Sequence, residues 1–83
     1  MARATHDPRY KRLIEALADA RRRAGLTQTQ LAEKLGSRQQ FVSKYEAGER
    51  RLDIVEFADI ARVLALDVAS LIDAMPNSSG AST

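Results

Sequence analysis

Apolar residues recur at intervals of three and four in five separate runs of this chain, the spacing of one buried face of an α-helix. Three of the runs stop at a glycine, Gly25, Gly36 or Gly48, where helices commonly end. The predicted helices cover residues 8–24, 28–35, 38–47, a stretch from a cap at Asp53 to about 65, and 68–74. The pattern therefore predicts an all-α fold built from short helices.

The helix starts are marked by side chains that can cap a first turn. Asp7 followed by Pro8 fits such a start, because proline is favoured at the first helical position. In a capping box, a polar cap residue and a Glu, or a Gln, three residues later bond each other's backbone. Such boxes are predicted at Thr27 with Gln30, Ser37 with Gln40, and Asp53 with Glu56.

The same spacing predicts which side chains face the core. The predicted face of the first helix is Tyr10, Leu13, Leu17, Ala20 and Ala24, with Ile14 beside it. The third helix is expected to turn Val42 and Tyr45 inward and to half-bury Phe41, and the fourth to bury Phe57, Ile60, Ala61 and Leu64.

Residues 28–47 form two short predicted helices joined by a tight turn at Gly36 and Ser37. The outward positions of the second of these helices are all polar: Arg38, Gln39, Gln40, Ser43 and Lys44. Glutamine can pair with adenine through two hydrogen bonds, and lysine can donate to guanine. This face is therefore suited to reading base edges, and the alternative is an ordinary solvated helix surface.

This arrangement resembles the helix-turn-helix of the Cro/C1 phage-repressor type, also called the Xre family. The matching residues in the paired helices and just after them are Gln28, Leu31-Ala32, Leu35-Gly36, Gln39, Val42-Ser43-Lys44, Glu46 and Gly48-Glu49-Arg50. The similarity extends back through Arg21 and Gly25-Leu26-Thr27 and forward to about Leu71. It implies a compact five-helix, lambda-repressor-like DNA-binding domain over residues 8–75.

The resemblance also implies roles for individual residues. The second helix of the pair would lie in the major groove of double-stranded DNA, with base contacts from Gln39, Gln40, Ser43 and Lys44. Phosphate contacts are expected from Gln28, Arg38, Arg50 and Arg51. For Gln28, the alternative is a solvent-facing helix former.

Two acidic residues near this motif are expected to bind arginines instead of DNA. The resemblance pairs Arg21, which lies near the apolar face of its helix, with Glu46 in a partly buried ion pair. Glu49 is expected to hold a neighbouring arginine. Arg22 and Arg23 are expected to stay solvated at a helix C-terminus, where positive charge is favourable.

Composition limits the chain to one domain, since 83 residues bury only a small core. The absence of cysteine excludes disulfides and thiolate metal sites and favours a reducing cytoplasm. The net charge of +2 hides an asymmetry. Residues 1–50 carry eleven Lys and Arg against six Asp and Glu, a net +5, whereas residues 51–83 carry two against five, a net −3. A basic front suits a protein that meets a polyanion with one side, although solvated helix surfaces would give the same count.

The two ends of the chain differ from its middle. Residues 1–7 are expected to form a flexible arm, and residues 76–83, which are small and polar, a disordered tail. Neither a signal peptide nor a membrane span is predicted. The last helix has more apolar residues than one core face can cover, which indicates a partner surface, and the resemblance implies a two-fold dimer at this end of the domain. The alternative is ordinary core packing. The expected interface residues are Leu66, Leu71, Ile72 and Met75.

The favoured interpretation is a cytoplasmic, nucleoid-associated transcriptional regulator, a repressor that binds a near-palindromic operator as a homodimer. The alternative is an antitoxin or adaptor that binds a toxin or the transcription machinery as well as DNA. An enzyme is the least favoured hypothesis. The single histidine, His6, lies in the arm, and neither a phosphate-cradling glycine loop nor a metal-ligand cluster is visible. No cofactor and no metal are expected.

Overall fold

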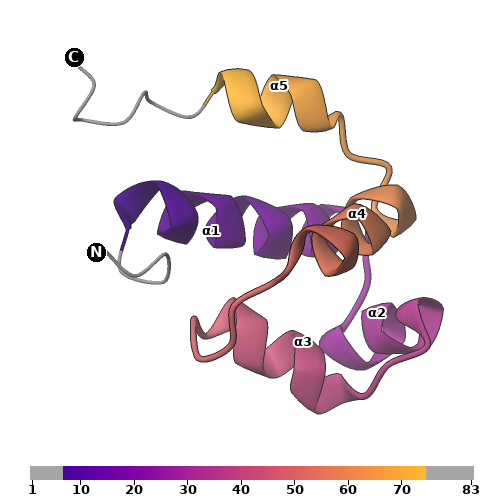
Figure 1. Cartoon of the computed structure of the whole chain (residues 1–83). Helices are drawn as coiled ribbons and strands as arrows, with labels where there is room; N and C mark the ends of the chain where they lie inside the picture. Colours follow the sequence, from indigo (N-terminus) through magenta and orange to yellow (C-terminus); the bar gives the residue numbers. More distant parts are fainter. Residues whose placement is uncertain (1–6, 75–83) are drawn as a thin grey trace.

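A computed structural model describes residues 7–74, which form five α-helices and, over that range, no β-strand. In chain order the helices are α1 (Pro8–Arg23), α2 (Gln28–Leu35), α3 (Gln39–Glu46), α4 (Ile54–Val63) and α5 (Val68–Asp73) (Figure 1). The predicted all-α class and five-helix architecture are confirmed. None of these helices is long and apolar enough to cross a membrane.

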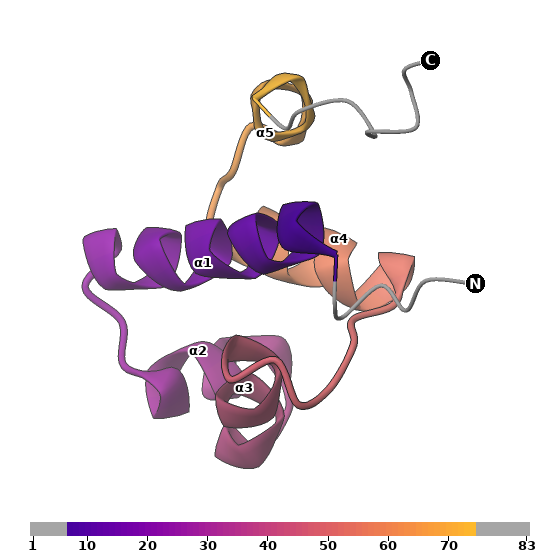
Figure 2. The ribbon, with the colours of Figure 1, turned by 90° about the vertical axis from the view of Figure 1, so that its left-hand side faces the viewer.

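The helices lie in three tiers. α1 and α4 form the middle tier, the pair α2 and α3 lies on one side of it, and α5 lies on the other side (Figures 1 and 2). α2 packs closely on α3, and contacts of α1 with α3 and of α2 with α4 fasten this pair to the middle tier. The α2–α3 pair therefore stands at one end of the molecule, on the opposite side of α1 from α5.

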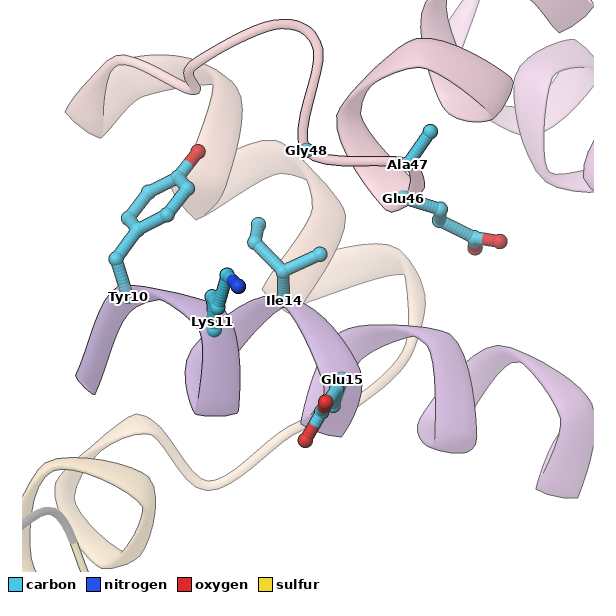
Figure 3. A pocket seen from close by; sticks show the side chains of 7 residues that line it. All are labelled: Tyr10, Lys11, Ile14, Glu15, Glu46, Ala47 and Gly48. Atoms are coloured by element: carbon cyan, nitrogen blue, oxygen red, sulfur yellow. The ribbon is translucent and has the colours of Figure 1, made fainter. Parts of the chain in front are cut away.

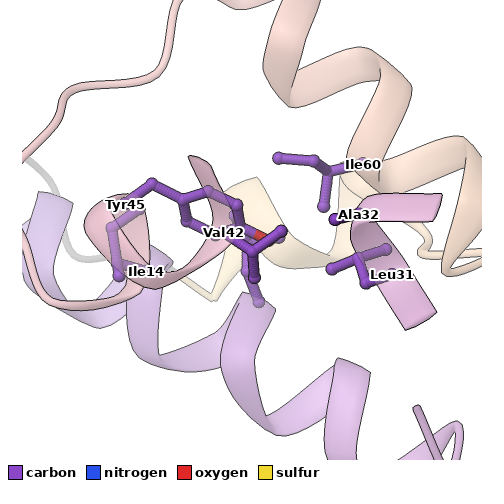
Figure 4. Packing of buried hydrophobic residues seen from close by; sticks show 7 residues of the cluster. Ile14, Leu31, Ala32, Val42, Tyr45 and Ile60 are labelled. Carbon is purple, nitrogen blue, oxygen red and sulfur yellow. The ribbon is translucent and has the colours of Figure 1, made fainter. Parts of the chain in front are cut away.

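The core lies where the middle tier meets the α2–α3 pair (Figure 4). Tyr45 and Val42 of α3 are completely buried there, together with side chains from the other three surrounding helices. Those side chains are Ile14 and Leu17 from α1, Leu31 and Ala32 from α2, and Ile60 from α4. Because two of the most buried residues belong to α3, its orientation is set by the core.

The buried face of α1 differs from the predicted one. Its buried residues are Ile14, Leu17, Ala18 and Arg21, whereas Leu13 and Ala20 are only half-buried and Ala24 is exposed. The prediction was right for Ile14 and Leu17 and wrong for Leu13, Ala20 and Ala24. Ala18 and Arg21 complete the buried face, because the Arg21 side chain is paired with Glu46 and can occupy a buried position. The α4 prediction was closer, with Ile60 and Ala61 buried and Phe57 and Leu64 half-buried.

Side-chain caps begin four of the five helices. The Asp7 carboxylate accepts a hydrogen bond from the Arg9 backbone N–H at 2.8 Å. The two capping boxes predicted at Thr27 with Gln30 and at Asp53 with Glu56 are both formed, with all four bonds between 2.7 and 3.0 Å. At α5 the cap is Asp67, which accepts from Ser70.

The third predicted box, Ser37 with Gln40, was wrong. Gly36 has the left-handed conformation, with φ of 70°, and the Ser37 N–H donates to the Ala32 carbonyl at 2.9 Å. This bond belongs to the Schellman-type ending of α2. Ser37 is therefore still part of the preceding helix end, and the N-cap of α3 is Arg38, whose side chain makes no capping bond.

Five helix ends, on four helices, were also predicted one or two residues too far out. α1 ends at Arg23, α3 runs only from Gln39 to Glu46, α5 ends at Asp73, and α4 ends at Val63. At the last of these ends Ala65 takes a left-handed conformation, with φ of 55°. The Leu66 N–H then closes the turn by donating to the Ala61 carbonyl at 2.9 Å. Because no glycine marks this stop, sequence reasoning continued α4 to residue 65.

Candidate nucleic-acid interface

The outward face of α3 carries the residues expected to contact DNA. Arg38, Gln39, Gln40 and Lys44 are exposed, and Ser43 is half-buried. On the opposite side of the same helix, Tyr45 is fully buried in the core. A short helix with one face locked and the other polar presents its outward side chains from a rigid base, which precise recognition requires.

A buried ion pair anchors the end of α3 to α1. Arg21 Nε donates to Glu46 Oε2 at 2.7 Å and Arg21 Nη2 to Glu46 Oε1 at 3.1 Å, which is the two-bond geometry favoured by arginine and carboxylate. The third arginine nitrogen, Nη1, donates to the Leu26 carbonyl at 2.8 Å. The side chains are only 10% and 7% exposed, and the hydrogen bond to Glu46 raises the pKa of Arg21. The buried arginine therefore stays charged and paired with Glu46.

The ion pair continues as a chain of hydrogen bonds to the surface of α3. The Gln28 amide Nε2 donates to Glu46 Oε1 at 2.9 Å, and Gln39 Nε2 donates to the Gln28 oxygen at 2.8 Å. The link between Gln28 and Gln39 joins the first residues of α2 and α3. Gln39 is thus held in place by a relay that begins at a buried arginine. No local sequence pattern predicts this contact.

The relay leaves part of each amide available. A glutamine amide has two N–H donors and one oxygen acceptor. Gln39 uses one N–H donor in its bond to Gln28. Its second N–H and its oxygen remain available, and these are the two groups that pair with adenine. Gln28 uses one N–H donor in its bond to Glu46, and its oxygen accepts from Gln39. One N–H, at the positive end of α2, remains available for a phosphate.

Arg50 is held by a residue that the sequence did not suggest. Its guanidinium donates to both carboxylate oxygens of Glu56, at 2.9 and 2.8 Å, and its carbon lies 4.8 Å from the centre of the Phe41 ring. Hence Arg50 is paired with Glu56 of α4. Within residues 7–74 Glu49 forms no ion pair, so the expectation that it holds a neighbouring arginine was wrong. The sequence signal for the pair of Arg50 and Glu56 was weak, because the predicted capping box at Asp53 already accounted for Glu56.

The remaining cations of this region are exposed. Arg38 and Arg51 take no part in an ion pair within the part of the chain that the structure describes, and Lys44 is likewise exposed. The loop that carries Arg51 is fastened to α1, because the Leu52 N–H donates to the Tyr10 hydroxyl at 3.1 Å. An exposed arginine on a fixed loop beside α3, such as Arg51, is suited to contacts with phosphates.

The hollow beside this loop is a poor ligand site. It lies between α1 and the end of α3 and has a volume of about 260 Å³ (Figure 3). That volume is below the usual range for small-molecule pockets, and charged Lys11, Glu15 and Glu46 line it together with Tyr10, Ile14, Ala47 and Gly48. Among residues 7–74, no cluster of His, Cys, Asp or Glu has the arrangement needed for a metal ion.

The residues expected at a dimer interface differ in how exposed they are. Leu66 packs against the core, Leu71 is half-buried, and Ile72 on α5 is 58% exposed. Met75 lies outside the described residues, as do most of the predicted arm and the predicted tail. Two further apolar side chains, Ile54 and Val55 in the first turn of α4, are 76% and 66% exposed, and sequence reasoning missed them.

Comparison with known proteins gives one family. A family model described as Helix-turn-helix matches residues 17–71. The chain is also similar to a solved structure described as an XRE-family like protein from Pseudomonas syringae pv. tomato str. DC3000. The two share 47% sequence identity with a TM-score of 0.76, over 82% of this chain and 83% of the other. Among curated proteins, no match was found.

Proposed function

The chain belongs to the Cro/C1-type (Xre) helix-turn-helix family of DNA-binding regulators, and from this premise we propose that it is a homodimeric repressor of a near-palindromic operator. In this proposal α3 enters the major groove. The observation that carries it is the polar outward face of α3, with Gln39 fixed by the relay through Gln28 to the ion pair of Arg21 and Glu46. As a regulator, the protein would act in the cytoplasm, on the nucleoid.

Base and phosphate contacts have separate carriers in this proposal. Gln39, Gln40, Ser43 and Lys44 would read base edges, and a good two-bond pair contributes about 1–3 kcal/mol of discrimination. Gln28, Arg38 and Arg51 would bind phosphates, which supply affinity and steep salt dependence without sequence choice. The phosphate contact predicted for Arg50 competes with its bonds to Glu56.

A homodimer is proposed because one α3 covers only a few base pairs. Two copies related by a two-fold axis would place their α3 helices in successive major grooves about 34 Å apart. The exposed Ile72, Ile54 and Val55 offer apolar surface for a second copy. The same surface would suit the alternative, an antitoxin or adaptor, in which a different protein covers it. Sedimentation of the purified chain alone and pull-down from its host separate these two hypotheses.

The decisive experiment is the selection of bound sequences from random duplex DNA at a stated salt concentration. A two-fold symmetric site with half-sites one helical turn apart would support the proposal. If the variant with both Gln39→Ala and Gln40→Ala selected the same site as the wild type, the base-reading role of this face would be wrong. If the wild-type protein bound no duplex even at low ionic strength, the whole proposal would be rejected.

A further inference from the structure

Arg50 makes more contacts within the protein than a cation kept for DNA would need. Three of its five N–H donors are occupied, two by the carboxylate of Glu56 and one by the Arg51 carbonyl at 3.3 Å. Its guanidinium carbon also lies over the Phe41 ring, 4.8 Å from the ring centre. A phosphate would therefore have to compete with partners that are already in place.

These contacts join α3 to α4. Phe41 lies in the first turn of α3, and its ring meets the buried Tyr45 ring edge-on with centroids 5.3 Å apart. Glu56 lies in the first turn of α4 and also accepts the Asp53 N–H at 3.0 Å as part of the α4 cap. Arg50 thus connects an aromatic side chain packed on the core to the start of the next helix.

We propose that Arg50 is a positioning residue, which fixes the orientation of α3 against α4 through Phe41 and Glu56 and does not bind a phosphate. The inference rests on the proposed DNA-binding function. Arg51, the next residue, is exposed and has no ion-pair partner in the described chain, so it is the cation of this loop that contacts DNA. The two neighbouring arginines would then have different roles.

The test separates charge from geometry with the full chain, its selected operator duplex and a random-sequence duplex. Arg50→Lys keeps the positive charge but loses the two parallel bonds and the stacking, since lysine is a point charge on a flexible stem. A positioning role predicts that this variant loses operator affinity by about fivefold or more, the cost of one misplaced base contact. Its affinity for random DNA and its salt dependence would stay unchanged. If Arg50→Lys bound the operator like the wild type, the proposal would be overturned.

Glu56→Gln should change operator affinity in opposite directions for a positioning Arg50 and for a phosphate-binding Arg50. Glutamine can still complete a capping box, so α4 is expected to stay folded. If Arg50 positions α3, removing the Glu56 charge weakens operator binding. If Glu56 only restrains a phosphate-binding arginine, the same change strengthens binding more than Asp59→Asn does. Asp59→Asn is the matched control, because Asp59 is an exposed carboxylate on the same helix and, within residues 7–74, is paired only with Arg62.

Arg51→Gln calibrates the measurement. Each phosphate contact adds about 0.9 to the slope of log affinity against log salt concentration, so this variant should flatten the slope by about that amount per protomer. A similar flattening for Arg50→Gln would show a phosphate contact and overturn the inference. Thermal melting checks that each variant is folded. A wild-type protein that binds no duplex at low salt rejects the proposed function itself, whereas normal binding by Arg50→Lys and Glu56→Gln rejects only this inference.

Discussion

Tyr45 places its entire side chain in the core, yet its hydroxyl oxygen has no hydrogen-bond partner among residues 7–74. Burial also raises the pKa of this hydroxyl, which therefore stays protonated. A buried polar group without a partner costs roughly 1–3 kcal/mol. At this position the aromatic ring stabilises the fold, through Phe41 and the surrounding apolar residues, while the hydroxyl does not.

Replacing Tyr45 with phenylalanine is therefore expected to raise the free energy of unfolding by about 1 kcal/mol, because the ring remains and the unpaired hydroxyl is removed. Urea denaturation of both proteins measures the change. Tyr45→Ala is the control and should destabilise by about 3–5 kcal/mol, the usual cost of deleting a buried aromatic ring. A less stable Tyr45→Phe variant would mean that the hydroxyl has a partner in solution.

Ala65 is a second residue that lowers the stability of the fold, in this case through its backbone conformation. The left-handed φ of 55° costs an alanine about 1–2 kcal/mol, whereas glycine adopts it readily but loses more freedom on folding. We expect Ala65→Gly to stabilise the protein by about 0.5–1 kcal/mol in the same denaturation experiment. Gly36→Ala is the mirror-image control. Nothing lies within 4 Å of an added Cβ there, so no steric clash would contribute to its destabilisation. Equal effects of opposite sign would support this explanation, and a destabilised Ala65→Gly would contradict it.

Among the helices, the buried pair of Arg21 and Glu46 joins α1 to α3 and supports the relay to Gln39. Glu46→Gln leaves the arginine charge buried without a counter-charge, which typically costs about 3–5 kcal/mol. We expect a loss of this size in chemical denaturation, together with weaker base preference in sequence selection. Arg22→Gln serves as the control, because among the described residues Arg22 forms only an exposed pair with Asp19, so its loss should change stability very little. If a folded Glu46→Gln protein kept the operator choice of the wild type, the hydrogen-bond relay to Gln39 would not be needed for base recognition.

The pair of Arg50 and Glu56 gives a prediction for pH. The hydrogen bond from Arg50 lowers the pKa of Glu56 from its ordinary value of 4.5. A carboxylate with a lowered folded-state pKa stabilises the protein above its ordinary pKa, and this stability is lost as the pH falls through the lowered value. The wild type should therefore be more stable than Glu56→Gln near neutral pH, by less than about 1 kcal/mol since the pair is partly exposed. The difference should vanish in denaturation curves measured well below 4.5. A constant difference at all pH values would assign the effect to packing.

How far the sequence could predict these elements depends on the range of the contacts. The helices, two of the three capping boxes and the inward side of α3 follow from local spacing, and the structure contains all of them. The pair of Arg21 and Glu46 came from family resemblance. The relay between Gln28 and Gln39 and the pair of Arg50 and Glu56 depend on where helices and loops meet in space, which no local rule specifies.

At the scale of the whole molecule, the proposed homodimer needs an exposed apolar surface that a second copy covers. α5 contains no buried residue, and Ile72 lies exposed on it, on the opposite side of α1 from the α2–α3 pair. We expect Ile72→Asp to convert a dimer to monomers in sedimentation equilibrium and to weaken operator binding. Ile54→Asp, at the other exposed apolar site, is the matched variant and should leave the dimer intact. The reverse result would place the interface at the start of α4.

The bond between Gln28 and Gln39 has a consequence for the evolution of new targets. Exchanging residue 39 for a side chain that prefers another base would remove the donor that now satisfies the Gln28 oxygen. Drift toward a different target sequence is then expected to proceed through joint replacements at 28 and 39, and engineered variants of this scaffold should be drawn from libraries that randomise both positions together.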